Sequence, residues 1–387
     1  MNRHSGLRLV AALAGLGLLA ILWRLAFGLG SATALNDGYP WGLWIAFDVV
    51  TGTALATGGY AIAILVYILN RGRYHPLVRP ALVTSAFGYT MAGLSVVLDV
   101  GRYWALWKVP IYFWHWNLNS VLLEVALCIM AYTLVLWLEL APAFLERGTS
   151  ARSPRVRDFS LRALPVMNRA LIWIVALGLL LPTMHQSSLG SLMLLAGPRL
   201  HPLWNTPFLP LLFLISCVGM GYAAVVMEGA ISALLTRRRV ERAMLADLGR
   251  VVVPISLVYV VLRLGDLAWR GQLGALFAFD TYSVMALIEL ALAVAAPVML
   301  RSDALRRDLP NLFRAAMVLI IAGSLYRIDT FLVAFNPGPN WSYFPSVGEI
   351  LVSVGLVAFE ILGYIALVRF FPILSAQPPR YPALKAA

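Results

Sequence analysis

Five ionisable side chains, within long apolar stretches of this 387-residue chain or at the ends of such stretches, are candidates for one site. They are three carboxylates and two imidazoles: Asp48, Asp99, Glu124, His115 and His185. A charged group is costly to place in hydrocarbon, so such residues are functional candidates by default. Carboxylic acids and imidazoles are also the usual general acids and bases. The residue types therefore predict a site that handles protons, with Glu124, His185, His115 and Asp99 as its catalytic groups.

Polar and aromatic residues at a similar predicted depth would complete this site. Asp99 and Arg102 are three residues apart on one helical face, and they could instead neutralise each other. Tryptophans at the ends of apolar stretches are also typical of an interfacial aromatic belt. With these alternatives open, we expect the following residues to bind a ligand: Asp48, Trp44, Arg102, Trp116, Asn117, Gln186 and Ser187.

The elements that position these residues are predicted to be transmembrane helices. At 61% hydrophobic and 12% charged residues, the chain is far more apolar than a soluble domain. No alternation of period two runs through the apolar stretches, which excludes a β-barrel. The predicted fold class is an all-α integral membrane protein. Windows of about 20 apolar residues place ten spans, at 7–29, 41–69, 80–101, 113–141, 169–187, 204–235, 249–267, 277–300, 312–335 and 346–371.

The basic residues predict the orientation of these spans. Twenty-three of the thirty Lys and Arg residues fall in alternate gaps between the spans. Because Lys and Arg mark cytoplasmic loops, we expect both termini to be cytoplasmic and the five ionisable residues to approach the opposite face. The net charge of +12 is explained by loops that face anionic headgroups, and it does not indicate nucleic-acid binding. The six basic clusters are 3–8, 71–79, 147–169, 237–250, 301–314 and 369–385.

The chain is expected to form one membrane domain with two units of four helices. The first unit covers 41–187 and the second 204–335, with flanking helices at 7–29 and 346–371. Asp99-Val-Gly-Arg102 near the end of the span 80–101 resembles Arg263-Leu-Gly-Asp266 near the end of the span 249–267. Parallel repeats would explain this recurrence, and chance is the alternative. The stretch 7–29 is longer than the core of a signal peptide, about 7–15 residues, so we expect an uncleaved first helix.

A quinone, either menaquinone or ubiquinone, suits the predicted site. Its carbonyl oxygens need hydrogen-bond donors, and its reduction takes up two protons that a neighbouring acid can relay. We expect no metal site and no haem in the chain. Only His115 and His185 of the five histidines lie at span ends, so one haem is conceivable and two stacked haems are not. Cys128 and Cys217 lack CxxC spacing and are expected to be buried and unlinked.

A second polar set occupies the later spans. Its basic and acidic residues balance, so ion pairing is the preferred interpretation. Four further acids, Glu139, Glu228, Glu289 and Glu360, could contribute to a proton route from the cytoplasm, or could pair with cytoplasmic arginines. The second set comprises Arg263, Asp266, Asp280, Arg327, Asp329 and Glu349.

Three motifs carry a family resemblance. Residues 39–48 are Tyr-Pro-Trp-Gly-Leu-Trp-Ile-Ala-Phe-Asp, and residues 114–117 are Trp-His-Trp-Asn. These resemble membrane subunits of the NrfD/polysulfide-reductase superfamily. Residues 183–192, Thr-Met-His-Gln-Ser-Ser-Leu-Gly-Ser-Leu, with Leu-His-Pro-Leu-Trp at 200–204, are similar to the HybB-type membrane subunits of hydrogenase-2-like complexes.

The resemblance implies a quinone-reactive subunit of a respiratory complex in the bacterial inner membrane, which is not catalytic alone. It also implies a periplasmic iron–sulfur subunit as electron partner and, through it, a catalytic subunit such as a hydrogenase. Two other interpretations remain open. Ten spans with intramembrane acids also suit a proton-coupled secondary transporter, and a membrane anchor without a ligand is the third possibility.

Overall fold

The computed structural model describes residues 3–236 and 242–374. Ten of its helical segments are long and apolar enough to cross a membrane, and the described residues form no strand. The predicted all-α membrane fold is therefore confirmed. Arg237, Arg238, Arg239, Arg380 and Lys385 of the basic clusters lie outside the described residues. The spanning helices are α1 (Arg3–Phe27), α4 (His75–Asp99), α6 (Val121–Gly148), α7 (Pro154–Leu194), α8 (Leu209–Thr236), α9 (Arg242–Trp269), α10 (Thr281–Met299), α12 (Leu309–Ile328) and α13 (Val347–Phe370).

The remaining span, Trp44–Ile68, is the most buried of the ten, and we call it span 2. It is irregular: two of its four segments are π-helical, a geometry that is frequent at functional sites. Gly59 lets it approach α4 closely, because a Cβ atom added there would lie 3.0 Å from Leu82 and from Ser85. The backbone N–H of Gly59 donates to Ser85 Oγ at 2.9 Å. A third π-helical segment, η9 (Asp329–Val333), continues α12. Span 2 consists of η2 (Trp44–Thr51), α2 (Gly52–Leu55), α3 (Gly58–Ala63) and η3 (Ile64–Ile68).

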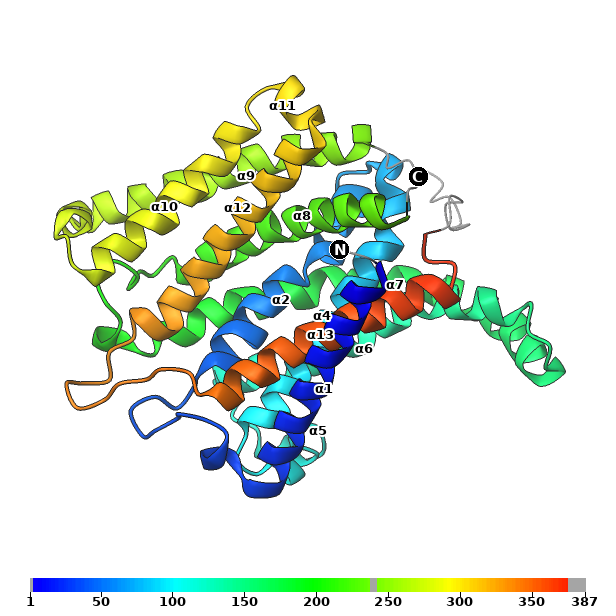
Figure 1. Ribbon diagram of the computed structural model, residues 1–387, viewed down its shortest axis with the longest axis horizontal. Coiled ribbons are helices and arrows are strands. Elements are labelled where there is room, and N and C mark those ends of the chain that lie inside the picture. Colours follow the sequence, from blue (N-terminus) through cyan, green and yellow to red (C-terminus); the bar gives the residue numbers. More distant parts are fainter. Residues whose placement is uncertain (1–2, 237–241, 375–387) are drawn as a thin grey trace.

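The helices pack in sequence-adjacent and sequence-distant pairs. α6 packs along α7, and α1 packs along α13, although these two helices lie at opposite ends of the chain (Figure 1). α4, α6 and α7 pack in succession as a first group, and α8, α9, α10 and α12 form a second group. Span 2 contacts both α4 and α12, so it lies between the two groups.

The two ends of the helix bundle differ in composition. At one end lie the basic connections 69–74, 149–153 and 300–308, with the short helix α11 (Asp303–Arg307). We call this the basic end. At the other, aromatic end lie the connections 28–43, 100–120, 195–208, 270–280 and 334–346. The remaining short segments are η1 (Leu29–Ser31), η4 (Gly72–Tyr74), η5 (Tyr103–Ala105), α5 (Lys108–Ile111), η6 (Phe113–His115), η7 (Gly197–Arg199) and η8 (Leu273–Phe277).

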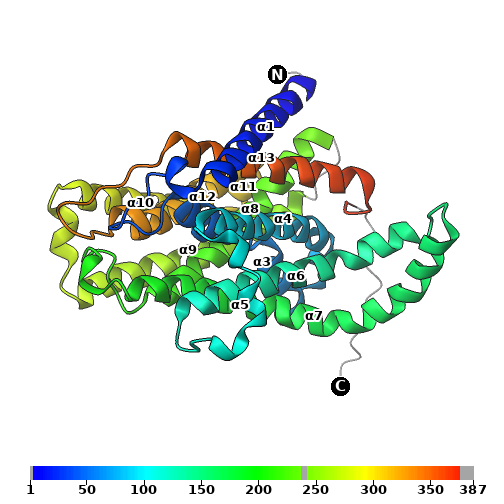
Figure 2. The same cartoon turned by 90° about the horizontal axis from the view of Figure 1, so that it is seen from below.

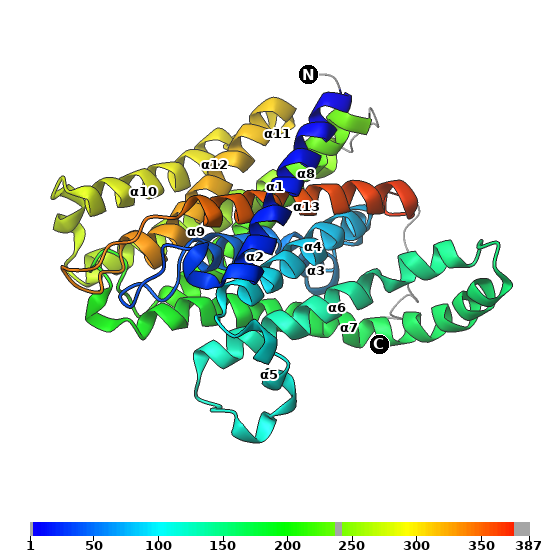
Figure 3. The same cartoon turned by 60° about the horizontal axis from the view of Figure 1, so that its bottom comes forward.

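Two spans differ from the prediction at their ends. The span expected at 113–141 begins only at Val121, because Ser120 caps α6 by accepting a hydrogen bond from Leu123 N–H. Residues 100–120 instead form a loop with α5 that stands out from the bundle (Figure 3). The span expected at 169–187 is part of the 41-residue helix α7. At 1.5 Å per residue, α7 is about 60 Å long, and its hairpin with α6 extends past the other helices (Figure 2).

Candidate functional site

Two predicted site residues, His185 and Gln186, meet span 2 in the interior. Both side chains are fully buried in α7. Gln186 Nε2 donates to Thr53 Oγ1 at 3.0 Å, and His185 Nε2 lies 3.3 Å from the same hydroxyl. The other imidazole nitrogen, His185 Nδ1, is buried without a hydrogen-bond partner. The imidazole therefore retains one nitrogen that can donate to, or accept from, a further group.

Arg327 of α12 completes this arrangement from the second group of helices. Its Nη2 donates to Gln186 Oε1 and to Phe213 O, each at 2.9 Å. Its Nη1 donates to Ser216 Oγ at 2.8 Å. The guanidinium is fully buried, and no carboxylate among the described residues pairs with it. The Arg327 cation is thus buried among neutral hydrogen-bond acceptors. We call His185, Gln186, Thr53, Ser216 and Arg327 the central cluster.

A second group of predicted residues lies on another face of span 2. Ser353 of α13 donates to Asp48 Oδ2 at 2.7 Å, and Asp48 is 7% exposed. Trp44 is buried and donates through Nε1 to the carbonyl oxygen of Glu349 at 3.1 Å. Asp99 is the last residue of α4, and Arg24 of α1 donates to the carbonyl oxygens on either side of it, those of Leu98 and Val100. Asp48 and Trp44 of span 2 therefore contact α13, whereas Thr53 of the same span contacts α7 in the central cluster.

The loop between α4 and α6 holds the predicted residues that are not brought together. Arg102, His115 and Asn117 are exposed there, so the structure does not join His115 to His185. Trp116 Nε1 donates to Val109 O within the loop, at 2.7 Å. The idea that Arg102 neutralises Asp99 is wrong, because no ion pair joins them in the described part of the chain.

Glu124 and Ser187 occupy intermediate positions. Glu124 lies half-buried in the first turn of α6, at the aromatic end. Ser187 Oγ donates back to its own helix, to Thr183 O and Met184 O. Neither side chain forms a hydrogen bond to the central cluster among the described residues.

Ion pairing accounts for part of the second polar set. Arg263 Nε lies 3.7 Å from Glu289 Oε1, which also accepts from the Tyr259 hydroxyl at 2.9 Å. Asp266 pairs with Arg270 at 2.7 Å. The pairing interpretation is wrong for Arg327, as described above. It is also wrong for Asp329, whose two buried carboxylate oxygens have no hydrogen-bond partner in the described residues.

The sequence analysis did not identify three hydroxyl residues that form hydrogen bonds in these sites: Thr53, Ser216 and Ser353. Hydroxyl residues are common in membrane helices, so their type gave no signal. Arg327 was noticed and assigned to ion pairing. Its nearest acid in sequence is Asp329, and residues two apart do not face each other on a helix. That spacing could have indicated a different partner for Arg327.

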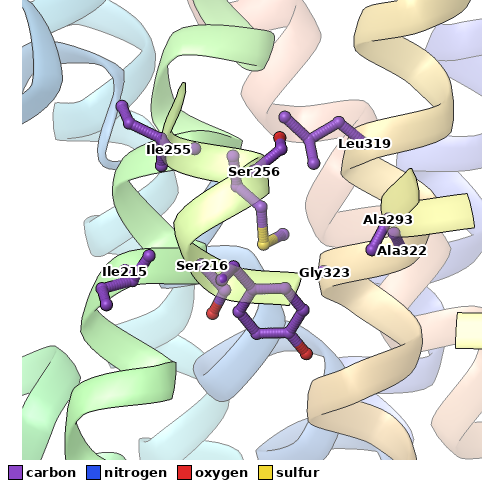
Figure 4. A pocket seen from close by; sticks show the side chains of 11 residues that line it. Ile215, Ser216, Ile255, Ser256, Ala293, Leu319, Ala322 and Gly323 are labelled. Atoms are coloured by element: carbon purple, nitrogen blue, oxygen red, sulfur yellow. The ribbon is translucent and has the colours of Figure 1, made fainter. Parts of the chain in front are cut away.

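A small cavity adjoins the central cluster inside the second group of helices (Figure 4). Its volume is about 20 Å³, and α8, α9, α10 and α12 line it with mainly apolar groups. Ser216, which accepts from Arg327, is one of the two serines in its wall. A pocket for an organic ligand usually needs about 300 Å³ or more. This cavity is therefore too small to hold a quinone ring.

The ten apolar helices and the buried polar groups between them define a polytopic membrane protein with ionisable residues inside its spans. The family model described as "Polysulphide reductase, NrfD" matches residues 31–337. The chain therefore belongs to the NrfD polysulphide reductase family.

Two curated relatives align over most of their length. The "Probable Ni/Fe-hydrogenase 2 b-type cytochrome subunit" of Escherichia coli (strain K12) is 46% identical over 364 residues, covering 92% of this chain and 89% of the relative. The "Menaquinone reductase, integral membrane subunit" of Nitratidesulfovibrio vulgaris (strain Hildenborough) is 28% identical over 387 residues, covering 94% of this chain and 90% of the relative. The predicted resemblance to HybB-type subunits is confirmed.

One of these names corrects a prediction. The Escherichia coli relative is named a b-type cytochrome subunit, which points to haem, so the expectation of a chain without haem is wrong by this comparison. Axial haem ligands are usually histidines, and His185, with its unpartnered Nδ1, is the one buried histidine among the side chains described. A haem held between two buried histidines does not fit these residues.

Proposed function

We propose that this protein is the quinone-reactive membrane subunit of a respiratory oxidoreductase complex of the hydrogenase-2 type. It would exchange electrons between an iron–sulfur partner at the aromatic end and menaquinone or ubiquinone in the bilayer. The catalytic subunit of the complex would supply or consume those electrons through the iron–sulfur partner. The names of the two relatives, a hydrogenase subunit and a menaquinone reductase subunit, support this assignment.

The observation that carries the proposal is the unpartnered His185 Nδ1 inside a buried polar cluster. Quinone reduction consumes two electrons and two protons, and oxidation of the quinol releases them. A buried imidazole can hydrogen-bond a carbonyl oxygen of the headgroup and exchange a proton with it. Glu124, half-buried at the aromatic end, is a candidate to exchange that proton with the aqueous phase.

The proposal includes an orientation. The Arg-rich connections would face the cytoplasm, with both termini, according to the preference of Lys and Arg for cytoplasmic loops. The aromatic end would then face the periplasm in the bacterial inner membrane. An iron–sulfur partner there would lie on the same side as Glu124 and the loop 100–120. Family membership weighs against the alternative of a secondary transporter.

Substitution of His185 in the assembled complex tests the site. His185→Ala and Glu124→Gln are each expected to lower quinone turnover at least tenfold, because a general acid or base contributes about 10²–10⁴-fold. Reduction of an artificial dye by the catalytic subunit should not change, since that reaction bypasses this chain. Both activities are measured on the same detergent-purified complex.

His201→Ala is the matched control. Its ring stacks on Tyr282 with centroids 4.2 Å apart, away from the central cluster. Burial lowers the pKa of His201, with nearby Asp280 opposing, so it is expected to be neutral at pH 7 and to have no part in turnover. Wild-type quinone turnover in both His185→Ala and Glu124→Gln would refute the site, as would an equal loss in His201→Ala.

A further inference from the structure

Helix α7 continues past its apolar part at the basic end of the protein. Its apolar sequence begins at Ala170, whereas the helix begins at Pro154. The stretch between these points, 154–169, is about 24 Å long at the helical rise, and we call it the α7 extension. It forms the outer part of the hairpin with α6, which lies beyond the other helices (Figure 2).

Arginines determine the charge of the α7 extension. It carries Arg155, Arg157, Arg162 and Arg169, against a single acid, Asp158. Asp158 pairs with Arg157 at 3.9 Å, and both side chains are exposed. Arg155, Arg162 and Arg169 form no ion pair within the described part of the chain. The α7 extension therefore presents three uncompensated positive charges.

These three arginines share one face of the helix with two apolar residues. In chain order the face consists of Arg155, Phe159, Arg162, Val166 and Arg169, and this spacing is that of a helical stripe. We call these five residues the arginine stripe. Phe159 and Val166 are 67% and 65% exposed. Arginine stems can lie along an apolar surface while their charged heads reach phosphate groups, so the stripe suits the boundary between headgroups and acyl chains.

The arginine stripe faces away from α6. On the opposite face of α7, Ser160 is buried, and a Cβ atom added to Gly148 of α6 would collide with it. Towards the membrane, the stripe continues from Arg169 through Trp173 and Leu177 at helical spacing. These two side chains are 75% and 45% exposed, as expected for lipid-facing positions of a spanning helix. The lipid-facing surface of α7 therefore leads directly into the arginine stripe.

The α7 extension contains a point at which it can tilt towards the bilayer. Pro165 lies inside the helix, where it removes a backbone hydrogen bond and favours a kink. Figure 1 shows the outer part of α7 curving away from the direction of its spanning part. A tilt at this proline would place the arginine stripe against the membrane surface.

We propose that the arginine stripe docks on the anionic phospholipid headgroups of the leaflet at the basic end. Its positive charge complements these headgroups, and its position continues the lipid-facing surface of α7. Each basic residue close to an anionic surface strengthens attachment about fivefold, so the three arginines together hold the hairpin on the membrane. A second copy of the chain would instead bring like charges together at this face. The docking needs neither a quinone nor a partner subunit, so it goes beyond the proposed function.

Quenching of a fluorescent probe on the arginine stripe tests the docking. Val166→Cys carries the probe in the full-length chain, and the native Cys128 and Cys217 are buried and free. The labelled chain is reconstituted into liposomes of phosphatidylcholine, with or without phosphatidylglycerol, that contain a phospholipid with a quencher on its acyl chain. We expect quenching to be greater by roughly twofold or more with phosphatidylglycerol. High salt should remove the difference, because it screens the charges.

Paired substitutions identify the residues responsible. Arg155→Gln with Arg162→Gln should weaken attachment about 25-fold, at about fivefold for each charge, and return quenching to the phosphatidylcholine level. Arg155→Lys with Arg162→Lys keeps the charge and should keep the quenching. The matched control is Arg301→Gln with Arg314→Gln, which removes the same charge from exposed positions of the basic end outside α7. It should leave quenching unchanged.

Three results would overturn the proposal: equal quenching in the two kinds of liposome, unchanged quenching in the Arg155→Gln and Arg162→Gln variant, or an equal fall in the control. Equally weak quenching in both kinds of liposome, with a change in probe emission on addition of polyglutamate, would assign the stripe to an acidic protein instead. Both leaflets of the liposomes have the same composition, so the direction of insertion does not affect the result.

Discussion

Arg327 is a buried cation whose hydrogen bonds go to neutral groups. Its partners Gln186, Ser216 and the Phe213 carbonyl come from α7 and α8, so one side chain of α12 links both groups of helices. A guanidinium is suited to this role because its planar fork presents several donors in fixed directions. The same donors orient Gln186, which shares the Thr53 hydroxyl with His185.

Replacement of Arg327 should therefore affect both stability and turnover. Arg327→Met leaves Gln186 Oε1 without its donor, whereas Phe213 O still accepts from Ser216 Oγ. An unsatisfied buried group costs about 1–3 kcal/mol. We expect a lower unfolding temperature in detergent and at least tenfold slower quinone turnover. Arg327→Lys keeps the charge with fewer directed donors and should give intermediate values.

Arg314→Met provides the comparison for Arg327. Arg314 is exposed at the basic end, and its Nε donates to Pro310 O of its own helix. Unfolding temperature and turnover should match the wild type in this variant. An Arg327→Met protein as stable and as active as Arg314→Met would show that the central cluster does not need the cation.

Residue type and spacing identified some of the buried groups and misplaced others. Asp48, Trp44, His185 and Gln186 are buried, as expected for polar groups inside apolar stretches. His115 and Asn117 are exposed, because an aromatic segment such as Trp-His-Trp-Asn can either begin a span or form an interfacial loop. Hydropathy alone cannot distinguish the two cases.

The contact between α1 and α13 depends on two glycines. A Cβ atom added to Gly355 would collide with the backbone of Gly17, so the helices approach too closely for a side chain at this point. Small residues at helix crossings are common in membranes, where close packing replaces the hydrophobic effect as the driving force. Gly355 is therefore a packing requirement of the α1–α13 pair.

Two glycine-to-alanine substitutions separate packing from helix propensity. Alanine is more favourable than glycine in a helix interior by about 1 kcal/mol. At Gly265 of α9, where an added Cβ meets nothing within 4 Å, the substitution should keep or raise the unfolding temperature. At Gly355 it should lower that temperature and loosen α1. An equal rise of the unfolding temperature in both variants would exclude the close contact between Gly355 and Gly17.

Span number was predictable from the sequence, whereas span ends were not. Ten apolar windows gave ten spanning helices, because the cost of unpaired backbone groups in hydrocarbon forces such windows to be helical. The ends of the spans depend on local hydrogen bonds, such as the cap at Ser120. They also depend on whether a helix continues past its apolar segment into polar sequence, as α7 does. The hydropathy of span 2 also gave no indication of its π-helical turns.

At the scale of the whole molecule, the basic connections gather at one end and the aromatic connections at the other. Arg73, Arg250 and Asp247 form an ion-pair network at the basic end. Charge placement in the sequence was sufficient to predict that alternate connections share an end. Which end faces the cytoplasm depends on the membrane, and it stays a prediction.

Cysteine labelling in spheroplasts can determine this orientation. Ser150→Cys places a thiol at the basic end, and Asp37→Cys places one at the aromatic end; both positions are exposed. The native Cys128 and Cys217 are buried and free, so background labelling should be low. A membrane-impermeant maleimide is expected to label Asp37→Cys in intact spheroplasts, and Ser150→Cys only after lysis. The opposite pattern would reverse the proposed topology.

The length of α7 has a mechanical consequence. The helix carries Arg155 at the basic end and His185 near the other, thirty residues away, or about 45 Å at the helical rise. Pro165, ten residues after Arg155, and Pro182, three residues before His185, each interrupt the hydrogen-bond ladder of the helix, which leaves a stiff section between two flexible points. A force on the hairpin of α6 and α7 would therefore be transmitted along α7. It would change the tilt of the helix at His185.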